Sequence, residues 1–159
     1  MVTKLPSTAL TGKTATLTGI NVGEDDLTVY DEGTWTPAVK IGLTDITDSG
    51  STTGKFTRIG NVVHITCRVY FDRGTNTGTL SITGLPVASA ASTLSALSIR
   101  VDNSIDASPA LGASVNDASS TISLYVQPDS TGGTLAGMTD AQVAASTTVN
   151  MIITGFYFA

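Results

Sequence analysis

The 159-residue chain has little charge, and most of what it has is acidic. Eight Lys and Arg stand against 13 Asp and Glu, which gives a formal net charge of −5 at pH 7. Proteins hold a phosphate backbone with clustered basic side chains. The basic residues of this chain are few and scattered, so nucleic acid is excluded as an expected partner.

Cysteine and histidine are almost absent. The one cysteine, Cys67, allows no intrachain disulfide, and the one histidine, His64, excludes paired-histidine metal sites. The sequence also lacks a Gly-x-Ser-x-Gly elbow, a Walker loop and a Gly-x-Gly-x-x-Gly turn. We therefore predict no catalytic residues, no metal ligands and no cofactor.

Long hydrophobic runs are missing as well. No apolar stretch approaches the roughly 20 residues that a helix needs to cross a bilayer. The first 12 residues lack the apolar centre of a secretory signal peptide. We therefore expect no membrane insertion.

Hydroxyl side chains and glycine are abundant, with 27 Thr, 16 Ser and 16 Gly. Threonine favours strands because its branched Cβ packs well on a pleated surface. Glycine fits the turns between short strands. This composition is typical of an all-β protein.

Alternating apolar and polar residues predict the individual strands. The clearest is 61–71, in which Cys67 lies on the apolar face and His64 on the polar face. The same alternation marks residues 34–41, 78–86, 93–101 and 121–127, with turn clusters between them. Pro37 cannot donate to a ladder, so its strand is expected at an edge or a bulge. The pattern predicts an antiparallel β-sandwich or jelly-roll-like domain over residues 30–159.

One short helix is predicted near the C-terminal end. Thr139 and Gln142 have the spacing of a capping box, in which the hydroxyl accepts a backbone amide and the glutamine reaches back. We expect one or two turns.

Residues 1–29 differ from the rest of the chain. "ALTG" at 9–12 returns as "TLTG" at 16–19, in a tract with almost no large side chains. Such a tract buries too little apolar area to fold alone. Two interpretations stay open: a disordered leader, or an extended shaft segment that orders against identical neighbours.

The last predicted strand, 148–158, is apolar on both faces. The face opposite to its alternating core residues carries Ile152, Phe156 and Phe158. Burying one such side chain is worth about 1.5–3 kcal/mol, so leaving three in water forgoes much of the ~5–15 kcal/mol that stabilises a domain. Either another layer of the same subunit or a neighbouring subunit covers this face, and we favour the neighbour.

Carbohydrate is the ligand class that suits the remaining polar residues. Saccharides are held by aromatic faces and by neutral or acidic side chains. Tyr70 and Tyr125 are the candidate platforms, and the adjoining loops supply Arg73, Asn76, Gln127 and Asp129. The alternative is that both tyrosines pack across strands or against a partner subunit.

Paired carboxylates for glycoside hydrolysis are the enzymatic alternative. The acids of residues 23–26 and the pair Asp45 and Asp48 have that composition. Nothing apolar or aromatic nearby would raise the pKa of one of them, so we interpret them as solvated loop acids.

Five stretches, in order over residues 30–159, resemble the C-terminal domains of tailed-bacteriophage tail fibre and tailspike proteins. They are "DEGTWTP", "GKFTRIGNVVHITCRVYF", "GTLSITGLP", "LAGMTDAQV" and "NMIITGFYF". The "ALTG"-type repeats of the leader also look like those found where fibre shafts end.

The resemblance implies a homotrimeric β-sandwich at the distal tip of a virion tail fibre, next to other tail proteins. It implies roles in trimer assembly and in contact with a bacterial surface polysaccharide or another host receptor. It also places Trp35 in the motif that begins the fold, where it covers the core or a subunit contact. Two alternatives remain: a capsule-degrading glycosidase or lyase, and a trimerisation domain that binds nothing.

Overall fold

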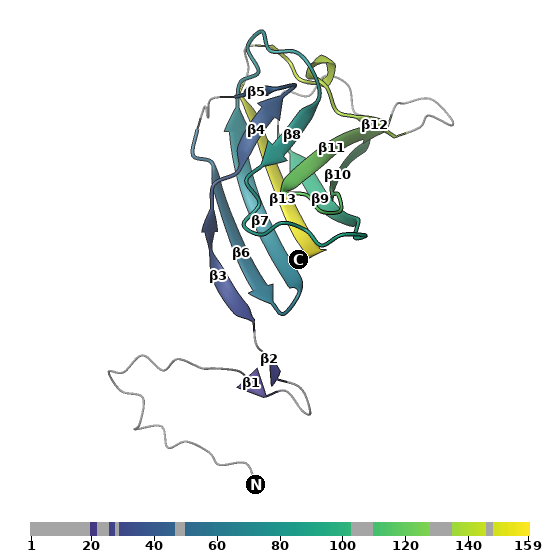
Figure 1. Cartoon of the computed structure of the whole chain (residues 1–159). Coiled ribbons are helices and arrows are strands. Elements are labelled where there is room, and N and C mark those ends of the chain that lie inside the picture. Colours follow the sequence, from purple (N-terminus) through teal and green to yellow (C-terminus); the bar gives the residue numbers. More distant parts are fainter. Residues whose placement is uncertain are drawn as a thin grey trace.

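The computed structural model describes residues 20–21, 26–27, 29–46, 50–102, 110–127, 135–145 and 148–159. Their secondary structure is β, apart from one 3-10 turn (Figure 1). Most of the predicted leader, residues 1–29, lies outside the described residues. Within it, β1 (Ile20–Asn21) and β2 (Asp26–Leu27) form a short antiparallel ladder.

All the other strands belong to one antiparallel sheet of 11 strands. In chain order they are β3 (Tyr30–Trp35), β4 (Ala38–Ile41), β5 (Thr44–Asp45), β6 (Thr53–Ile59), β7 (Val62–Phe71), β8 (Leu80–Thr83), β9 (Ser95–Val101), β10 (Ala110–Val115), β11 (Thr121–Gln127), β12 (Ala136–Gly137) and β13 (Val149–Phe158). Across the sheet the order is β3-β6-β7-β13-β9-β10-β11-β8-β4-β5, and β12 pairs with β11.

The sheet curls over on itself. Only Thr36 and Pro37 separate β3 from β4 in the chain, yet β3 is one edge of the sheet and β4 lies next to the other edge. Figure 1 shows β4, β8 and β11 lying across β7 and β13. The bend falls at β9, because Ser95–Leu97 pairs with β10 and Ser98–Val101 pairs with β13.

This topology confirms the predicted all-β, antiparallel class and refines the predicted architecture. The described residues form one continuous curled sheet, without the two separate sheets of a β-sandwich or jelly roll. The difference arises because β9 carries the hydrogen-bond ladder around the bend. Strand alternation reports which side chains face inward, and both architectures have the same alternation.

The core fills the space inside the curl. Its side chains come from the predicted apolar faces of β7, β8, β11 and β13, which are fully or almost fully buried: Val63, Ile65, Cys67, Val69, Phe71, Leu80, Ile82, Ile122, Leu124, Val126, Val149, Met151, Ile153 and Tyr157. On β9, Leu97 is buried, whereas Ile99 and Val101 are partly buried against the core. Trp35 covers the core beside β6, and its indole Nε1 donates to the carbonyl of Lys55 at 3.3 Å.

Two predicted elements differ in the structure. Residues 34–41 were expected as one strand, but they form the end of β3 and all of β4, and Pro37 lies in the link because it cannot donate to a ladder. The predicted helix is a single 3-10 turn, η2 (Asp140–Gln142). The capping box of Thr139 and Gln142 is present as predicted.

The turn stays short for a packing reason. Met138 before it and Val143 after it are both buried, and Val143 already has extended backbone. Only Thr139 and the three residues of η2 therefore lie between these two buried side chains. No helix of the described residues is long and apolar enough to span a membrane.

Candidate functional site

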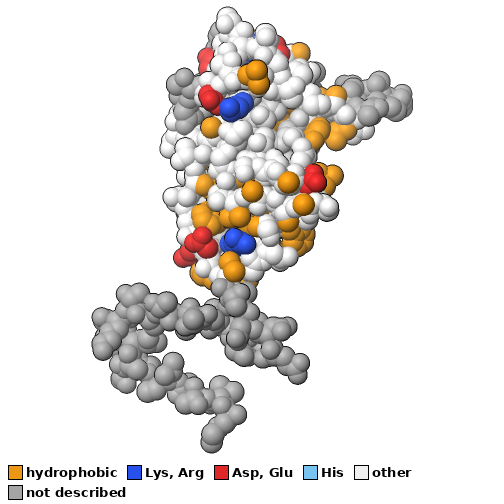
Figure 2. Space-filling view, viewed as in Figure 1, with side chains coloured by type: hydrophobic (Ala, Val, Ile, Leu, Met, Phe, Trp, Pro, Cys, Tyr) orange, Lys and Arg blue, Asp and Glu red, His pale blue; other side chains and the backbone are white. Residues whose placement is uncertain are grey.

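An exposed row of apolar side chains crosses four neighbouring strands at one end of the sheet. In register, Tyr30 pairs with Ile59, Ile59 with Val62, and Val62 with Phe158. Phe156 stands one step along β13 on the same face. We call these five residues the apolar band. Figure 2 is viewed from the side on which β4 and β8 cross the sheet, so it shows the inner side of β3, β6 and β7 and not the outer face that carries the band.

Four of the five residues of the band are exposed in the single chain, and Val62 is partly buried. Phe156 and Tyr30 are each 56% exposed, Ile59 is 50% exposed and Phe158 is 37% exposed. The rings of Phe156 and Phe158 meet edge-to-face with centroids 6.3 Å apart. The Tyr30 hydroxyl donates to Glu32 at 2.7 Å, and this hydrogen bond raises the pKa of the tyrosine.

The structure thus places all three predicted interface residues on the outer face of β13. Phe156 and Phe158 are exposed, and Ile152 is partly buried between its register partners Arg68 and Arg100. The sheet of the same subunit does not cover this face at Phe156. A group of exposed apolar side chains on neighbouring strands is typical of an interaction surface.

Beyond Ile152 the same face becomes polar. Arg68 Nε donates to Asn150 Oδ1 at 2.9 Å, and Asn150 Nδ2 donates to Asp102 Oδ2 at 2.8 Å. Asp102 also pairs with Arg100 at 2.8 Å. The Arg68 guanidinium lies 4.8 Å from the centre of the Tyr70 ring. Tyr70 is therefore part of a packed polar network, which matches the packing alternative for this residue.

Arg73 and Asn76, two further predicted ligand residues, hold the loop that follows β7. Asn76 Nδ2 donates to the Arg73 carbonyl at 2.8 Å, and Arg73 Nη1 donates to the Asn76 carbonyl at 3.4 Å. Arg73 also pairs with Asp140 at 3.6 Å, and its buried Nε has no hydrogen-bond partner. Asn76 therefore acts within the loop, and Arg73 also ties the loop to η2.

Tyr125 and Gln127 lie on β11, on the outer side of that strand. The register neighbours of Tyr125 are Gly112 on β10 and Gly137 on β12, so no side chain stands directly beside it on either strand. Three strands separate β11 from β7 in the sheet. The structure therefore does not bring these residues together with Tyr70, and Asp129 lies outside the described residues.

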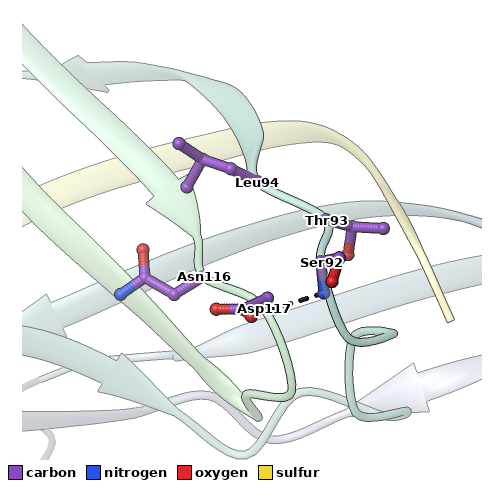
Figure 3. Close-up of a pocket in the computed structure, with 5 residues that line it drawn as sticks. All are labelled: Ser92, Thr93, Leu94, Asn116 and Asp117. Atoms are coloured by element: carbon purple, nitrogen blue, oxygen red, sulfur yellow. Dashed lines mark hydrogen bonds between the residues drawn. The ribbon is translucent and has the colours of Figure 1, made fainter.

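A pocket that the sequence did not predict lies where two strands diverge. Val115, the last residue of β10, pairs with Ser95, the first residue of β9, and beyond this pair the two segments separate. The space between them is about 320 Å³ and is lined by Ser92, Thr93, Leu94, Asn116 and Asp117 (Figure 3).

Hydrogen bonds hold the two walls of the pocket together. Asp117 Oδ2 accepts the Ser92 amide at 3.3 Å, as Figure 3 shows. Behind it, the Ser89 hydroxyl donates to the Asn116 carbonyl at 2.5 Å and accepts the Ser119 amide at 2.9 Å. The walls therefore have a fixed spacing.

The backbone on each wall is strained. Ser92 and Ala118 have φ of 60° and 47°, a region that costs a residue with a side chain of the order of 1–3 kcal/mol. The sequence does not predict the pocket, because Ser, Asn and Asp are ordinary turn residues. Nothing in the local pattern joins positions that are 25 residues apart.

The clearest pKa shifts lie away from the pocket. Burial raises the pKa of the Cys67 thiol to about 12, and burial also raises the pKa of Tyr157, whose hydroxyl donates to the Val87 carbonyl at 2.7 Å. Both groups belong to the core. Over the described residues, no three His, Cys, Asp or Glu side chains lie together in a group that could hold a metal ion.

Comparison with known proteins rests on the fold. No protein-family model and no curated protein matches the chain. The crystal structure of the Dettilon tailspike protein (gp208) superposes with a TM-score of 0.65 at 24% sequence identity. The fold is tailspike-like. The match covers 81% of this chain but only 24% of the tailspike chain, so this tailspike-like fold corresponds to a part of that protein.

Proposed function

We propose that the chain is a homotrimeric module of a bacteriophage tail fibre or tailspike, located in the virion tail and attaching it to a bacterial surface polysaccharide. The apolar band is the observation that carries the proposal. The tailspike-like fold supports the phage tail role, and the resemblance of the five sequence stretches to fibre-tip domains supports three copies.

Assembly explains the band through the hydrophobic effect. Covering a large apolar side chain such as Phe156 is worth about 1.5–3 kcal/mol, and the band presents several of them on adjacent strands. A neighbouring copy that covers the band would also reach Ile152. The predicted interface of Ile152, Phe156 and Phe158 then extends to Tyr30, Ile59 and Val62.

Attachment to a surface polysaccharide agrees with the low charge and the many hydroxyl side chains of the chain. Of the two tyrosine candidates we propose Tyr125, and its glycine neighbours in register, Gly112 and Gly137, support this choice. Tyr70 is engaged with Arg68. A trimer that binds no polysaccharide on a glycan array would instead support the trimerisation domain.

We also propose that the role is binding without catalysis. Groups with shifted pKa values mark catalytic sites when they lie in a cleft. Cys67 and Tyr157 lie in the core, and Tyr30 lies on the open apolar band. None of these groups lines the pocket.

Sedimentation equilibrium tests the assembly. The wild-type chain is expected to have a mass of three times 16.2 kDa. Phe156→Asp places a charge on the band and should dissociate the trimer into monomers. Leu43→Asp is the matched control, because Leu43 is 98% exposed in the link between β4 and β5; this variant should stay trimeric. A monomeric wild type at micromolar concentration, or a trimeric Phe156→Asp variant, would contradict the proposal.

A further inference from the structure

We propose that the pocket between the start of β9 and the end of β10 binds one neutral sugar residue of the surface polysaccharide. The pocket is lined by Ser92, Thr93, Leu94, Asn116 and Asp117. The inference rests on the proposed attachment role, and it names a binding site on a different part of the sheet from Tyr125.

The pocket has the size of a small-ligand site. Its volume of about 320 Å³ lies at the lower end of the usual range of ~300–1,000 Å³. Figure 3 shows Leu94 and Asn116 on the two sides of the opening, with Asp117 reaching toward Ser92. A single ring therefore fits the space better than a longer segment of polymer.

Asp117 gives the pocket its polar chemistry. Its Oδ2 accepts the Ser92 amide, and no hydrogen bond or ion pair engages Oδ1 among the described residues. An ionised carboxylate only accepts hydrogen bonds. It therefore suits a ligand that offers hydroxyl donors, and it repels one that carries a carboxylate or a phosphate.

Leu94 gives the pocket its apolar wall. The side chain is 75% exposed, although it directly precedes β9. A sugar ring combines hydroxyl groups at its edge with C–H groups on its faces. The C–H groups can pack on Leu94 while the hydroxyls reach Asp117, so the two sides of the pocket match the two kinds of sugar surface.

The walls of the pocket are already in place before a ligand binds. The Ala118 amide donates to the Ala90 carbonyl at 3.1 Å, and the Thr93 hydroxyl donates to the same carbonyl at 2.7 Å. Binding therefore orders little additional chain, which lowers its entropic cost. The strained backbone of Ser92 and Ala118 is held by these same contacts.

The pocket also lies next to the end of β13, because the Ala90 amide donates to the Phe158 carbonyl at 2.8 Å. It is thus close to the apolar band. A neighbouring copy that covers the band would border the pocket without being required to complete it, and the experiment below separates a ligand site from a subunit contact.

Amide-resolved NMR titration of the full chain tests the proposal. D-galactose and N-acetyl-D-glucosamine are the neutral probes, and D-glucuronate is the anionic probe. We expect at least one neutral sugar to shift the amides of Ser92, Leu94 and Asp117, with a Kd on the order of 1 mM for a ligand of this size. Glucuronate should bind at least about tenfold more weakly, because Asp117 repels it.

Two variants locate the binding. Asp117→Asn removes the charge but keeps an oxygen for the Ser92 amide, and it should weaken binding about tenfold or more. Asp72→Asn is the matched control, because Asp72 Oδ1 likewise accepts a loop amide, that of Gly74 at 2.8 Å. The control should bind as the wild type does. Leu94→Ala should weaken binding without changing the fold.

Three outcomes would overturn the pocket proposal. One is the absence of shifts at these amides with both neutral sugars, and another is unchanged affinity in Asp117→Asn. The third is a change of sedimentation mass in Asp117→Asn, which would make the pocket a subunit contact. If the wild type remains a trimer and binds polysaccharide on an array, such a result refutes the pocket and leaves the proposed function standing.

Discussion

Trp35 and Gly54 show how a single contact depends on pairing between distant residues. They are register partners on β3 and β6, and a Cβ on Gly54 would collide with the indole ring. The family resemblance implied that Trp35 covers either the core or a subunit contact, and the structure places it on the core. The sequence did not predict the glycine beneath the ring, because that contact needs the strand register.

Cys67 makes stability sensitive to alkaline pH. The pKa of its thiol rises from 9.0 to about 12 on folding, so above pH 9 the unfolded chain loses a proton that the folded chain keeps. The contribution of this thiol to the free energy of unfolding is therefore fully present below pH 9, and it is lost as the pH rises toward 12. We expect a loss of about 1 kcal/mol between pH 9 and pH 10 in the free energy of unfolding measured with urea.

The variant Cys67→Ala isolates the contribution of the thiol. It should be less stable than the wild type at pH 8 because it leaves a cavity, but its stability should change less between pH 9 and pH 10. Burial also raises the pKa of Tyr157, so this residue too makes the folded chain less stable as the pH rises. Its effect begins near the ordinary tyrosine pKa of 10.0. If the free energy of unfolding changed equally between pH 9 and pH 10 in the wild type and in Cys67→Ala, folding would not change the pKa of the thiol.

At the scale of single elements, β13 shows what the sequence predicted and what it did not. The strand, its buried face and the apolar residues on its second face all follow from local alternation. The place of β13 in the sheet does not follow from local alternation. β13 pairs with β7 along its full length and with β9 on its other side, and these pairings join segments that are far apart in the chain.

The pocket was beyond prediction for the same reason. Ser92 and Asp117 meet only because β9 and β10 pair and then diverge. The candidate platforms Tyr70 and Tyr125 could be chosen from the sequence as outward-facing, but not placed relative to each other. Side-chain orientation follows from a period of two residues, whereas proximity depends on the order of strands in the sheet.

The loop after β7 depends on η2, and one substitution tests this link. Asp140 Oδ1 accepts the Gly78 amide at 2.8 Å, and Oδ2 pairs with Arg73. Asp140→Ala leaves the amide and the partly buried Arg73 without this partner. We expect the free energy of unfolding to fall by about 1–3 kcal/mol in urea titrations.

A surface ion pair provides the control for Asp140. Asp45 pairs with Lys40 at 3.2 Å but is 70% exposed. Asp45→Ala should change stability by less than about 1 kcal/mol, because water already screens the pair. Similar losses in both variants would mean that Asp140 acts only as a surface charge.

At the scale of the whole molecule, the proposal of binding without catalysis has a direct test. Glycoside hydrolysis needs two carboxyl groups about 5–10 Å apart across a groove, whereas the described pocket contains one, Asp117. Incubation with capsular polysaccharide is therefore expected to release no reducing ends above the rate without protein. A steady release that is lost after heat denaturation would identify the chain as an enzyme.

The curl of the sheet determines when the chain can fold. β3 and β4 are neighbours in sequence, but the ladder that joins them runs through the rest of the sheet, and β13, which lies between β7 and β9, is the last of these strands in chain order. A nascent chain in which β13 has not yet been made therefore has β7 and β9 without the strand that connects them. Folding must wait for this late segment and then form mostly long-range contacts, which predicts slow folding and a period in which chaperones protect open strand edges.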